Sequence, residues 1–550
     1  MKKPKLLAAL LGGCLGFLSF PEINWTPLIV IAYVPYFWLL NHCEGVKETV
    51  WYTWLHSAVM TLGGFFWIAH TAMEFGGLPW FAAYPILLLY AAVGSINLAV
   101  TGGVIALLRK KLSMKWQALW VTAVFVAIEA FFPKLFYWYA GNAIYQVIPF
   151  IQIADLGGAI LLTTQILWVN YAVFALLDQF IFPRLQALKN LPRRFAPHEA
   201  LVTIALGGGI ALFSFVYGKI RLQQVDEHIS QAVQKNIGVV QGNLGNLDRL
   251  LAQFGHRETL QKAVEIHRDL TLALRQQLTQ PLDLVLWPEG TYPYPFPDKR
   301  PEHQALAELT REINAALVTG GHATQREPEY RYFNSMALIE PGQNHASAIY
   351  KKHILLAFGE YMPLANIFPS LKELIPAISD FGAGPGPEMM RYRDFKIAAI
   401  ICYEALDPRY LREYALQGAN IILNSTNDSW YGPWQEKEQH LALAQLRSVE
   451  TRLAQVRATN TGISAVIMPN GEITNRAEID KPTFFAAQLP LMEMPATFYA
   501  RYGDWWAGVM IVIVVGMLVY RWRYPIVMET SSKSSGKNAF RVVSKRGRAS

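Results

Sequence analysis

Eight apolar runs constrain this chain more than any other feature of its sequence. Seven lie within the first 217 residues, and the eighth begins at residue 506. Apolar runs of this kind form membrane-spanning helices, although several are shorter than the roughly 20 residues that cross a bilayer without strain. We therefore predict an α-helical transmembrane bundle of about eight spans. The runs are 6–20, 26–40, 51–70, 80–107, 116–132, 160–181, 201–217 and 506–520.

Basic residues mark alternate loops between these runs. Lysine or arginine precedes the first run and follows the second, fourth, sixth and eighth runs. Loops 21–25 and 71–79 contain neither, and loop 133–159 contains only Lys134. Because basic loops stay in the cytoplasm, both ends are predicted to lie inside and residues 218–505 outside. The net charge of +8 therefore indicates topology, and no nucleic-acid partner is predicted.

The first run has an alternative interpretation. It follows a group of lysines and could be a signal peptide, and residues 11–14 resemble a lipoprotein cleavage box. The apolar run continues past Cys14, however, and a second run follows at once. These two features favour a span that stays in the mature protein.

The composition indicates two kinds of domain. The chain is 52% hydrophobic, too apolar for a soluble protein, but 16% charged, too charged for a bundle alone. Residues 218–505 alternate strand-like and helix-like runs, which indicates an α/β domain. We predict spans one to seven in residues 1–217, an extracytoplasmic catalytic domain in 218–505, an eighth span in 506–520 and a disordered, basic cytoplasmic tail in 521–550.

A cysteine ends one of the predicted strands. The run 396–401 is apolar and β-branched, as in a buried strand, and Cys402, Tyr403 and Glu404 follow it. Cys402 is the only one of the three cysteines that lies far from an apolar span. An unpaired thiol in an outer domain is either reactive or hidden, and a small buried core residue is the alternative interpretation.

Two further strand ends carry ionisable groups. Glu289 follows the run 282–287, where partial burial would suit a general base, and the alternative is a surface glutamate in a turn. Lys351 and Lys352 could lower the pKa of a nearby thiol and stabilise an oxyanion, or could be a solvated basic pair. Glu360 could orient one of these lysines or be a plain turn residue.

Together these groups form a set for covalent catalysis. We expect the base, the cation and the thiol to lie at the ends of three strands of one sheet, where they can converge. The sequence shows no serine-centred elbow and no glycine fingerprint for a dinucleotide. His353 and His440 lack the spacing of a zinc site, so no metal and no cofactor are predicted.

Several ordered motifs resemble those of a known family. Residues 287–290 (WPEG), 352–360 and 401–404 (ICYE) resemble the Glu–Lys–Cys triad of the nitrilase superfamily. Residues 424–432 (NSTNDSWYG) and 457–462 (RATNTG) resemble segments of one of its branches. With apolar spans on both sides, the chain resembles the apolipoprotein N-acyltransferase family over nearly its whole length. This resemblance implies a nitrilase-like αββα sandwich for the outer domain.

The resemblance also implies roles for individual residues. Glu289 would be the general base, Lys352 the cation that supports the oxyanion, and Cys402 the nucleophile. The eight-residue step to Glu360 selects Lys352 over its neighbour. The residues implied to support the site are Glu360, Tyr403 and Glu404, and those implied to contact substrate or the bilayer from a loop are Asn427, Trp430 and Tyr431.

Two positions depart from the family pattern. Residue 357 is alanine where proline is frequent, and residue 250 is leucine where some members have tryptophan. Within the spans, Glu129 is the clearest ionisable residue. It is expected either to be paired inside the bundle or to line a lipid cavity.

The resemblance implies a two-step acyl transfer. A phospholipid, taken to be phosphatidylethanolamine, would acylate Cys402 as a thioester, and the α-amine of a diacylglyceryl apolipoprotein would then accept the acyl chain. The protein would be a monomer in the bacterial inner membrane, with its catalytic domain facing the periplasm. A membrane-tethered nitrile or amide hydrolase would use the same triad, but its soluble substrate would not need eight spans. A transporter would be expected to carry more intramembrane ionisable groups.

Overall fold

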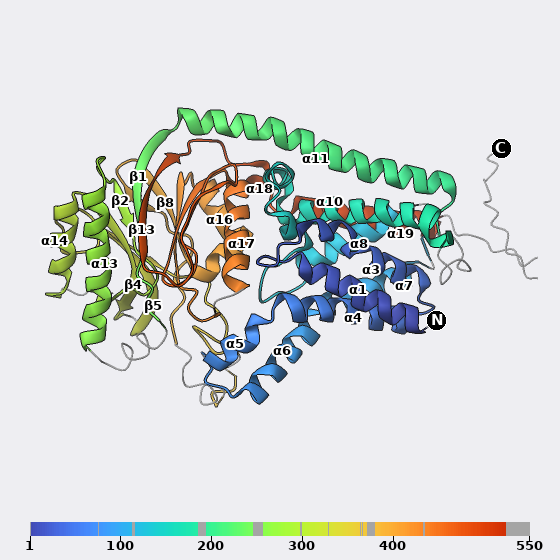
Figure 1. Ribbon diagram of the computed structural model, residues 1–550, viewed down its shortest axis with the longest axis horizontal. Coiled ribbons are helices and arrows are strands. Elements are labelled where there is room, and N and C mark those ends of the chain that lie inside the picture. The colour runs from blue at the N-terminus through green and yellow to red at the C-terminus, as the bar shows by residue number, and fades with distance from the viewer. Residues whose placement is uncertain are drawn as a thin grey trace, which may run out of the picture.

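The structure of this chain is a computed structural model, and it divides into a helical bundle and a sandwich of two β-sheets (Figure 1). The long helix α11 (Pro197–Gln231) runs from the bundle to the sandwich. It continues well past residue 217 and leads directly into the first strand. The residues described are 2–74, 76–109, 111–112, 116–184, 194–245, 257–297, 300–327, 329–363, 365, 367–370, 380–432 and 435–523.

Apolar helices from the first part of the chain, joined by α19, make up the bundle. Within the described residues, four helical stretches are long and apolar enough to cross a membrane: Trp80–Leu108, Ala154–Arg184, Pro197–Gln231 and Trp505–Arg523. Helices that do not meet both conditions, length and apolar character, occupy the other apolar runs, so the count of eight spans stays a prediction. The main helices are α1 (Lys2–Leu18), α3 (Val34–His42), α4 (Val46–Gly64), α5 (Trp67–Glu74), α6 (Trp80–Gly94), α7 (Ile96–Leu108), α8 (Gln117–Phe131), α10 (Ala154–Leu176) and α19 (Trp505–Arg523).

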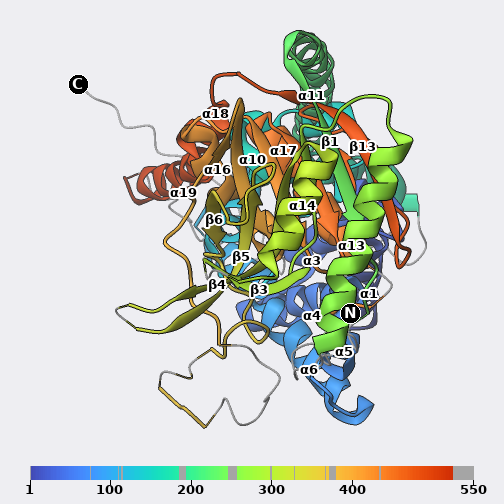
Figure 2. The ribbon, with the colours of Figure 1, turned by 90° about the vertical axis from the view of Figure 1, so that its left-hand side faces the viewer.

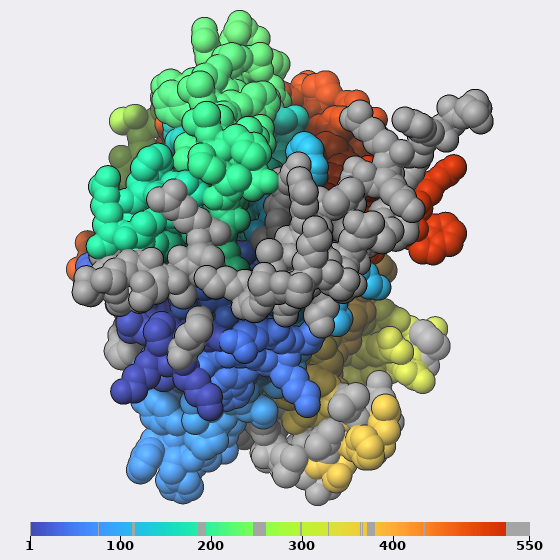
Figure 3. Space-filling model, turned by 90° about the vertical axis from the view of Figure 1, so that its right-hand side faces the viewer, coloured from blue at the N-terminus to red at the C-terminus, as the bar shows by residue number. Residues whose placement is uncertain are grey.

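Two of the bundle helices expose large apolar side chains. On α11, Leu201 is 68% exposed and Phe213 is 62% exposed, and on α19 Val512 is 70% exposed. Figure 3, which views the molecule from the bundle end, shows α11 (green) projecting beyond the other helices. Many exposed apolar side chains on one helix are typical of contact with a membrane or a partner, and a bundle surrounded by lipid fits them.

The part of the chain from β1 to β13 is a four-layer αββα sandwich, so the predicted architecture of this domain is confirmed. One sheet has the strand order β13-β1-β2-β4-β5-β6 with β3 paired to β4, and the other has the order β12-β11-β10-β9-β8-β7. Helices α13 (Arg257–Gln277) and α14 (His303–Ile313) cover the first sheet (Figure 2). Helices α16 (Pro408–Leu416) and α17 (Glu436–Thr451) lie between the second sheet and the bundle (Figure 1).

The strands are short, and most of them are buried. Those of the first sheet are β1 (Val233–Gln241), β2 (Leu284–Leu286), β3 (Tyr292–Phe296), β4 (Ala316–Gln325), β5 (Arg331–Ile339), β6 (Ala348–Lys351) and β13 (Thr483–Leu491). Those of the second sheet are β7 (Met390–Tyr392), β8 (Phe395–Ile401), β9 (Ile421–Thr426), β10 (Ala454–Thr459), β11 (Ala465–Ile467) and β12 (Ile473–Arg476).

Side-chain alternation explains why the central strands are apolar throughout. Leu284 and Leu286 of β2 belong to the core between the two sheets. Val285 and Trp287 belong instead to the core under α13 and α14. Because successive residues of a strand point to opposite faces, a strand that is covered on both sides reads as a continuous apolar run.

The three strand ends expected on one sheet belong to two sheets, so that expectation was wrong. β2, which precedes Glu289, and β6, which precedes Lys352, are in the first sheet, whereas β8, which precedes Cys402, is in the second. The groups still meet, because the sandwich brings the ends of these strands to one edge. At that edge Ser425 Oγ donates a hydrogen bond of 3.1 Å to the carbonyl of Trp287 and links the sheets.

A buried network of charges joins the sandwich to the bundle. Arg452, next to the end of α17, donates to Asp155 of α10 at 2.8 Å and to Gln152 at 2.7 Å. Arg221 of α11 adds a hydrogen bond of 2.6 Å to the same Asp155 carboxylate. Breaking such a pair would leave an uncompensated buried charge, so these contacts hold the two parts in a defined arrangement.

Candidate active site

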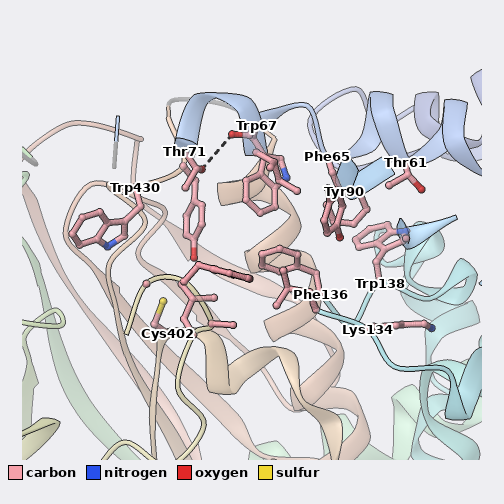
Figure 4. A pocket seen from close by; sticks show the side chains of 18 of the residues that line it. Thr61, Phe65, Trp67, Thr71, Tyr90, Lys134, Phe136, Trp138, Cys402 and Trp430 are labelled. Carbon is pink, nitrogen blue, oxygen red and sulfur yellow. Dashed lines mark hydrogen bonds between the residues drawn. The ribbon is translucent and has the colours of Figure 1, made fainter. Parts of the chain in front are cut away.

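A cavity of about 1280 Å³ lies between the sandwich and the bundle. Glu289, Lys352 and Cys402 line it from the sandwich. Figure 4 shows aromatic side chains of the bundle extending away from Cys402 along this cavity. They are Phe65, Trp67, Tyr90, Phe136 and Trp138. A single cavity therefore connects three ionisable groups to an apolar space inside the bundle.

Glu289 is buried and stands at the edge of the first sheet. Its Oε1 accepts a hydrogen bond of 2.6 Å from Asn334 Nδ2 and lies 3.6 Å from Lys352 Nζ. Gly320 of β4 gives it room, because a Cβ at that position would lie 2.5 Å from the Glu289 Cα. A carboxylate held in place beside a cavity can act as a general base.

Lys352 follows β6 and is only 1% exposed. Its Nζ lies 2.9 Å from Oε1 and 2.8 Å from Oε2 of Glu360. Burial disfavours the ammonium, but Glu360 and Glu289 outweigh it and raise the pKa of Lys352 above its ordinary value. The side chain is therefore a cation at neutral pH. Lys351 points elsewhere, and its Nζ donates to Gln325 Oε1 at 3.0 Å.

Asn334 of β5 is a site residue that the sequence analysis missed. Its Nδ2 donates to Glu289 Oε1 at 2.6 Å and to Glu360 Oε1 at 2.7 Å. The only signal in the sequence is a polar residue near the start of a buried strand. The amide and the Lys352 ammonium together hold two carboxylates that would otherwise repel each other.

Cys402 begins the short turn η6 (Cys402–Leu406) at the end of β8. Its φ is +49°, a left-handed conformation that is uncommon for a residue with a side chain and often occurs at functional sites. Burial raises the pKa of the Cys402 thiol, Glu289 raises it further, and Lys352 opposes them only in part. The thiol is therefore protonated at neutral pH and needs a base at the moment of attack. It forms no disulfide, since all three cysteines are free.

Glu404 ties the Cys402 turn to the segment that carries Lys352. Its Oε2 accepts from the Ile401 N–H at 2.8 Å. Its Oε1 accepts from the His353 N–H at 2.8 Å and from the Tyr350 hydroxyl at 2.7 Å. Burial raises the pKa of Glu404, whereas these donors and Lys352 counteract the shift. The Glu404 carboxylate thus connects the two sheets through hydrogen bonds.

Tyr403 connects the same turn to the bundle. Its hydroxyl donates to the carbonyl of Leu135, in the segment after α8. Its ring meets Phe136 edge to face, with 6.0 Å between the ring centroids. The turn that carries Cys402 is therefore fixed to the wall of the apolar half of the cavity.

The loop after β9 contributes two aromatic residues to the cavity, Trp430 and Tyr431. Tyr431 is 4% exposed and packs edge to face on Trp67 of α5, with 5.1 Å between the centroids. It lies in the cavity wall and not on an outer surface. Asn427 is fully buried, and its Oδ1 accepts from the Ser429 N–H at 3.3 Å, so it shapes the turn.

Of the two expectations for Glu129 of α8, the structure shows the one in which it lines a cavity. It lines the cavity, and its Oε1 accepts a hydrogen bond of 3.1 Å from the Ala140 N–H. Of the two departures from the family pattern, Ala357 lines the cavity and forms an isolated bridge with Tyr361. Leu250 lies outside the described residues.

A second charged cluster, also missed in the sequence, lies behind Cys402. His440 Nδ1 is 3.0 Å from Asp428 Oδ1, and Arg457 Nη2 is 2.7 Å from Asp428 Oδ2. Ligand atoms of Cys402, Asp428 and His440 lie within 4.8 Å of one another, a set that could hold a metal ion. The positively charged Arg457 beside Asp428 disfavours a cation there, and the described atoms form a hydrogen-bonded network.

Family models match the chain in two consecutive parts. Residues 12–172 match the apolipoprotein N-acyltransferase N-terminal domain. Residues 224–497 match the carbon-nitrogen hydrolase family. The first match covers most of the bundle helices, and the second covers the sandwich with Glu289, Lys352 and Cys402.

Curated relatives match nearly the whole chain. An apolipoprotein N-acyltransferase of Bdellovibrio bacteriovorus is 32% identical over 543 residues, which cover 93% of each chain. One of Geobacter metallireducens is 28% identical over 535 residues, 94% of this chain and 95% of the relative. One of Pseudomonas aeruginosa PAO1 is 27% identical over 529 residues, 94% and 96% of the two chains.

Solved structures of two related kinds each match about half of this chain. A mutant amidase from Nesterenkonia sp. AN1 is 18% identical, with a TM-score of 0.35, and the match covers 48% of this chain and 92% of that one. A carbon-nitrogen hydrolase from Helicobacter pylori G27 is 16% identical, also with a TM-score of 0.35, and covers 47% and 89%.

The relatives therefore share both parts of this chain, in the same order and over nearly its full length. The family model of the first part is specific to one kind of enzyme, and that of the second part accounts for the sandwich. At 32% identity over 93% of its length to a curated member, this chain belongs to the apolipoprotein N-acyltransferase family.

Proposed function

We propose that this chain moves an acyl chain from phosphatidylethanolamine, through a thioester on Cys402, to the N-terminal α-amine of diacylglyceryl-cysteine lipoproteins. Family membership makes it an acyltransferase with lipoprotein and phospholipid substrates in a membrane. The observation that supports the residue-level proposal is the shared cavity, with Glu289, Lys352 and Cys402 at one end and apolar walls in the bundle. Both substrates carry acyl chains, which such walls can accommodate.

In the first step Glu289 takes the proton of the Cys402 thiol. The thiolate attacks an ester carbonyl of the phospholipid, and the new C–S bond leaves negative charge on the carbonyl oxygen. Lys352 stabilises this oxyanion, since its ammonium is already held in place by Glu360. The ester C–O bond then breaks, and the leaving alkoxide recovers the proton from Glu289. The products are a lysophospholipid and a thioester on Cys402.

In the second step the α-amine of the lipoprotein attacks the thioester. A free α-amine has a pKa near 8, so part of it is neutral at physiological pH and can act as a nucleophile. Glu289 accepts the proton that the amine loses on attack, and Lys352 again faces the oxyanion. The C–S bond breaks, the thiolate recovers the proton from Glu289, and an N-acylated lipoprotein leaves.

The proposal includes a placement in the cell. Residues 1–217 would form spans one to seven, residues 218–505 would face the periplasm, and residues 506–520 would return the chain through the bacterial inner membrane to a cytoplasmic tail at 521–550. The support is the alternation of basic loops in the sequence. Because α11 is continuous through residue 217, that boundary would be a change of surroundings and not the end of a helix. We propose a monomer, because one chain supplies the whole triad.

The alternative is a hydrolase in which water replaces the amine. The cavity disfavours this alternative, because a small soluble substrate does not require apolar walls inside the bundle. Purified protein incubated with radiolabelled phosphatidylethanolamine should form a hydroxylamine-sensitive adduct on Cys402. Addition of a diacylglyceryl lipopeptide should then move the label to the peptide. Release of free fatty acid at the same rate with and without the lipopeptide would favour the hydrolase.

A further inference from the structure

His440 lies on α17 directly behind the Cys402 turn and is 2% exposed. Its Nε2 is 3.1 Å from the backbone carbonyl oxygen of Cys402. Its Nδ1 is 3.0 Å from Asp428 Oδ1 and 3.5 Å from Glu436 Oε1. The ring takes part in none of the proton transfers assigned to Glu289, yet it contacts the residue that carries the nucleophile.

Both close partners of the His440 ring are hydrogen-bond acceptors. A backbone carbonyl has no proton to donate, and an ionised carboxylate has none either. The two contacts are therefore both hydrogen bonds only when each ring nitrogen carries a proton. A neutral ring would set a lone pair against one of the two oxygens.

The surroundings keep the Asp428 carboxylate ionised. Burial works toward a higher pKa of Asp428, but Arg457 and His440 hold that pKa well below its ordinary value. Burial and Arg457 lower the pKa of His440 below its ordinary value, although the Asp428 and Cys402 acceptors work toward a higher pKa. Gly462 leaves the space for this arrangement, because a Cβ there would lie 2.2 Å from Asp428 Oδ2.

The Cys402 carbonyl belongs to the peptide that also carries the Tyr403 N–H. That peptide is trans, and in a trans peptide the C=O and the N–H point in opposite directions. A donor that holds the carbonyl on the α17 side therefore directs the N–H to the other side of the turn. The position of one ring thus sets the direction of one backbone donor next to the Cys402 thiol.

We propose that His440 is a positioning residue whose Nε2–H holds the Cys402 carbonyl and so directs the Tyr403 N–H at the oxyanion. Lys352 is then one donor to this oxygen, and the Tyr403 N–H is the second. The inference rests on the proposed role of Cys402 as nucleophile. It adds a residue that touches neither substrate nor the reacting atoms but acts through the backbone between Cys402 and Tyr403.

Two substitutions at His440 separate its two ring nitrogens. The amide nitrogen of Gln can take the place of Nε2, so His440→Gln keeps a donor to the Cys402 carbonyl. The shorter Asn reaches only the place of Nδ1, so His440→Asn keeps the contact with Asp428 but loses the contact with Cys402. The two variants have similar polarity and both lack the ring, which makes each a control for the other.

The assay is acylation of Cys402 by a p-nitrophenyl acyl ester, on full-length protein in detergent with Cys14 and Cys43 replaced by Ser. The thiol gives its proton to Glu289, the C–S bond forms, and the C–O bond breaks to release p-nitrophenolate. We expect His440→Asn to slow acylation about 10²-fold, as for loss of one oxyanion donor, with little change in KM. His440→Gln should stay close to the unsubstituted protein.

Alkylation of Cys402 by iodoacetamide distinguishes the proposed role from a merely structural one, because only a structural defect would slow it. That reaction needs the same thiol and base but forms no oxyanion, so both variants should alkylate at the unsubstituted rate. Equal acylation by all three proteins, or parallel losses of acylation and alkylation, would overturn the proposal. If the Asn variant does not fold, a tenfold loss of acylation in the Gln variant overturns it. Failure of phospholipid to acylate the unsubstituted protein would count against the proposed function alone, because the ester assay does not depend on it.

Discussion

Substitution of Lys352 by Met tests the proposed site most sharply, because its neighbour Lys351 is a matched control. The two lysines are adjacent in sequence but lie in different surroundings. Lys352 Nζ contacts both Glu360 oxygens at 2.8 and 2.9 Å and Glu289 at 3.6 Å, and the side chain is 1% exposed. Lys351 Nζ donates to Gln325 and lies 4.5 Å from the centre of the Phe333 ring.

Lys352→Met is expected to lower both the rate of acylation and the stability of the protein. Removal of one oxyanion donor costs on the order of 10²–10³ in rate, or about 2.7–4 kcal/mol of transition-state stabilisation. Removal of the cation also leaves two buried carboxylates, Glu289 and Glu360, with the Asn334 amide as their shared donor. Loss of one partner of a buried ion pair lowers the free energy of unfolding by about 3–5 kcal/mol. Lys351→Met gives up a partly exposed contact of about 0.5–1 kcal/mol and should retain activity.

The measurement is thioester formation with labelled phosphatidylethanolamine, together with thermal unfolding of each purified variant. Lys352→Met should lose both rate and stability. The double variant Lys352→Met/Glu360→Gln should recover stability, since it removes one of the two carboxylates, but not the rate. An inactive Lys351→Met beside an active Lys352→Met would refute the assignment. Recovery of the rate in the double variant would show that the lysine acts only by balancing charge.

Three further outcomes are expected. Cys402→Ala and Cys402→Ser should fold and insert yet form no acyl-enzyme, and N-acylation of a lipopeptide by the Ala variant would contradict the thioester mechanism. Asn334→Leu, which leaves Glu289 and Glu360 without their shared donor, should slow acylation about tenfold or more; an unchanged rate would limit Asn334 to a structural role. Single cysteines at Gln304 and at Lys2, in protein without other cysteines, should react with an impermeant maleimide from opposite faces of the membrane, and labelling from one face would refute the topology.

The sandwich could be foreseen because burial on both faces of a sheet leaves a signal in the sequence. The runs that became β1, β2, β4, β5, β8 and β9 are apolar for this reason. Short strands such as β6 (Ala348–Lys351) gave no comparable signal, because only Tyr350 is fully buried there. An apolar run predicts a strand but not the sheet to which the strand belongs. The division between two sheets is therefore evident only from the structure.

The residues around Glu289, Lys352 and Cys402 make contacts that sequence patterns do not predict. Asn334 contacts Glu289, which is 45 residues away in the sequence, and Arg457 contacts Asp428, which is 29 residues away. Polar contacts of this kind join different strands and helices, and no local periodicity records them. Comparison with zinc motifs does not reveal the contacts of His440, because its partners are a carboxylate and a backbone carbonyl.

The order of the two proposed half-reactions follows from the placement of Cys402. The thiol stands in a turn held by Glu404 on one side and by Tyr403 against the bundle on the other, so the attacked carbonyl must come to it. Both substrates must bring their reacting atoms to the same sulfur, between the same base and the same cation. A second substrate can reach that position only after the lysophospholipid has left it. Glu289 must also have given back its proton before it can accept another from the amine. The geometry therefore predicts ping-pong kinetics, with parallel lines in double-reciprocal plots, and lysophospholipid should inhibit in competition with the lipoprotein. Intersecting lines would require both substrates at Cys402 together, and a cavity with a second reacting position.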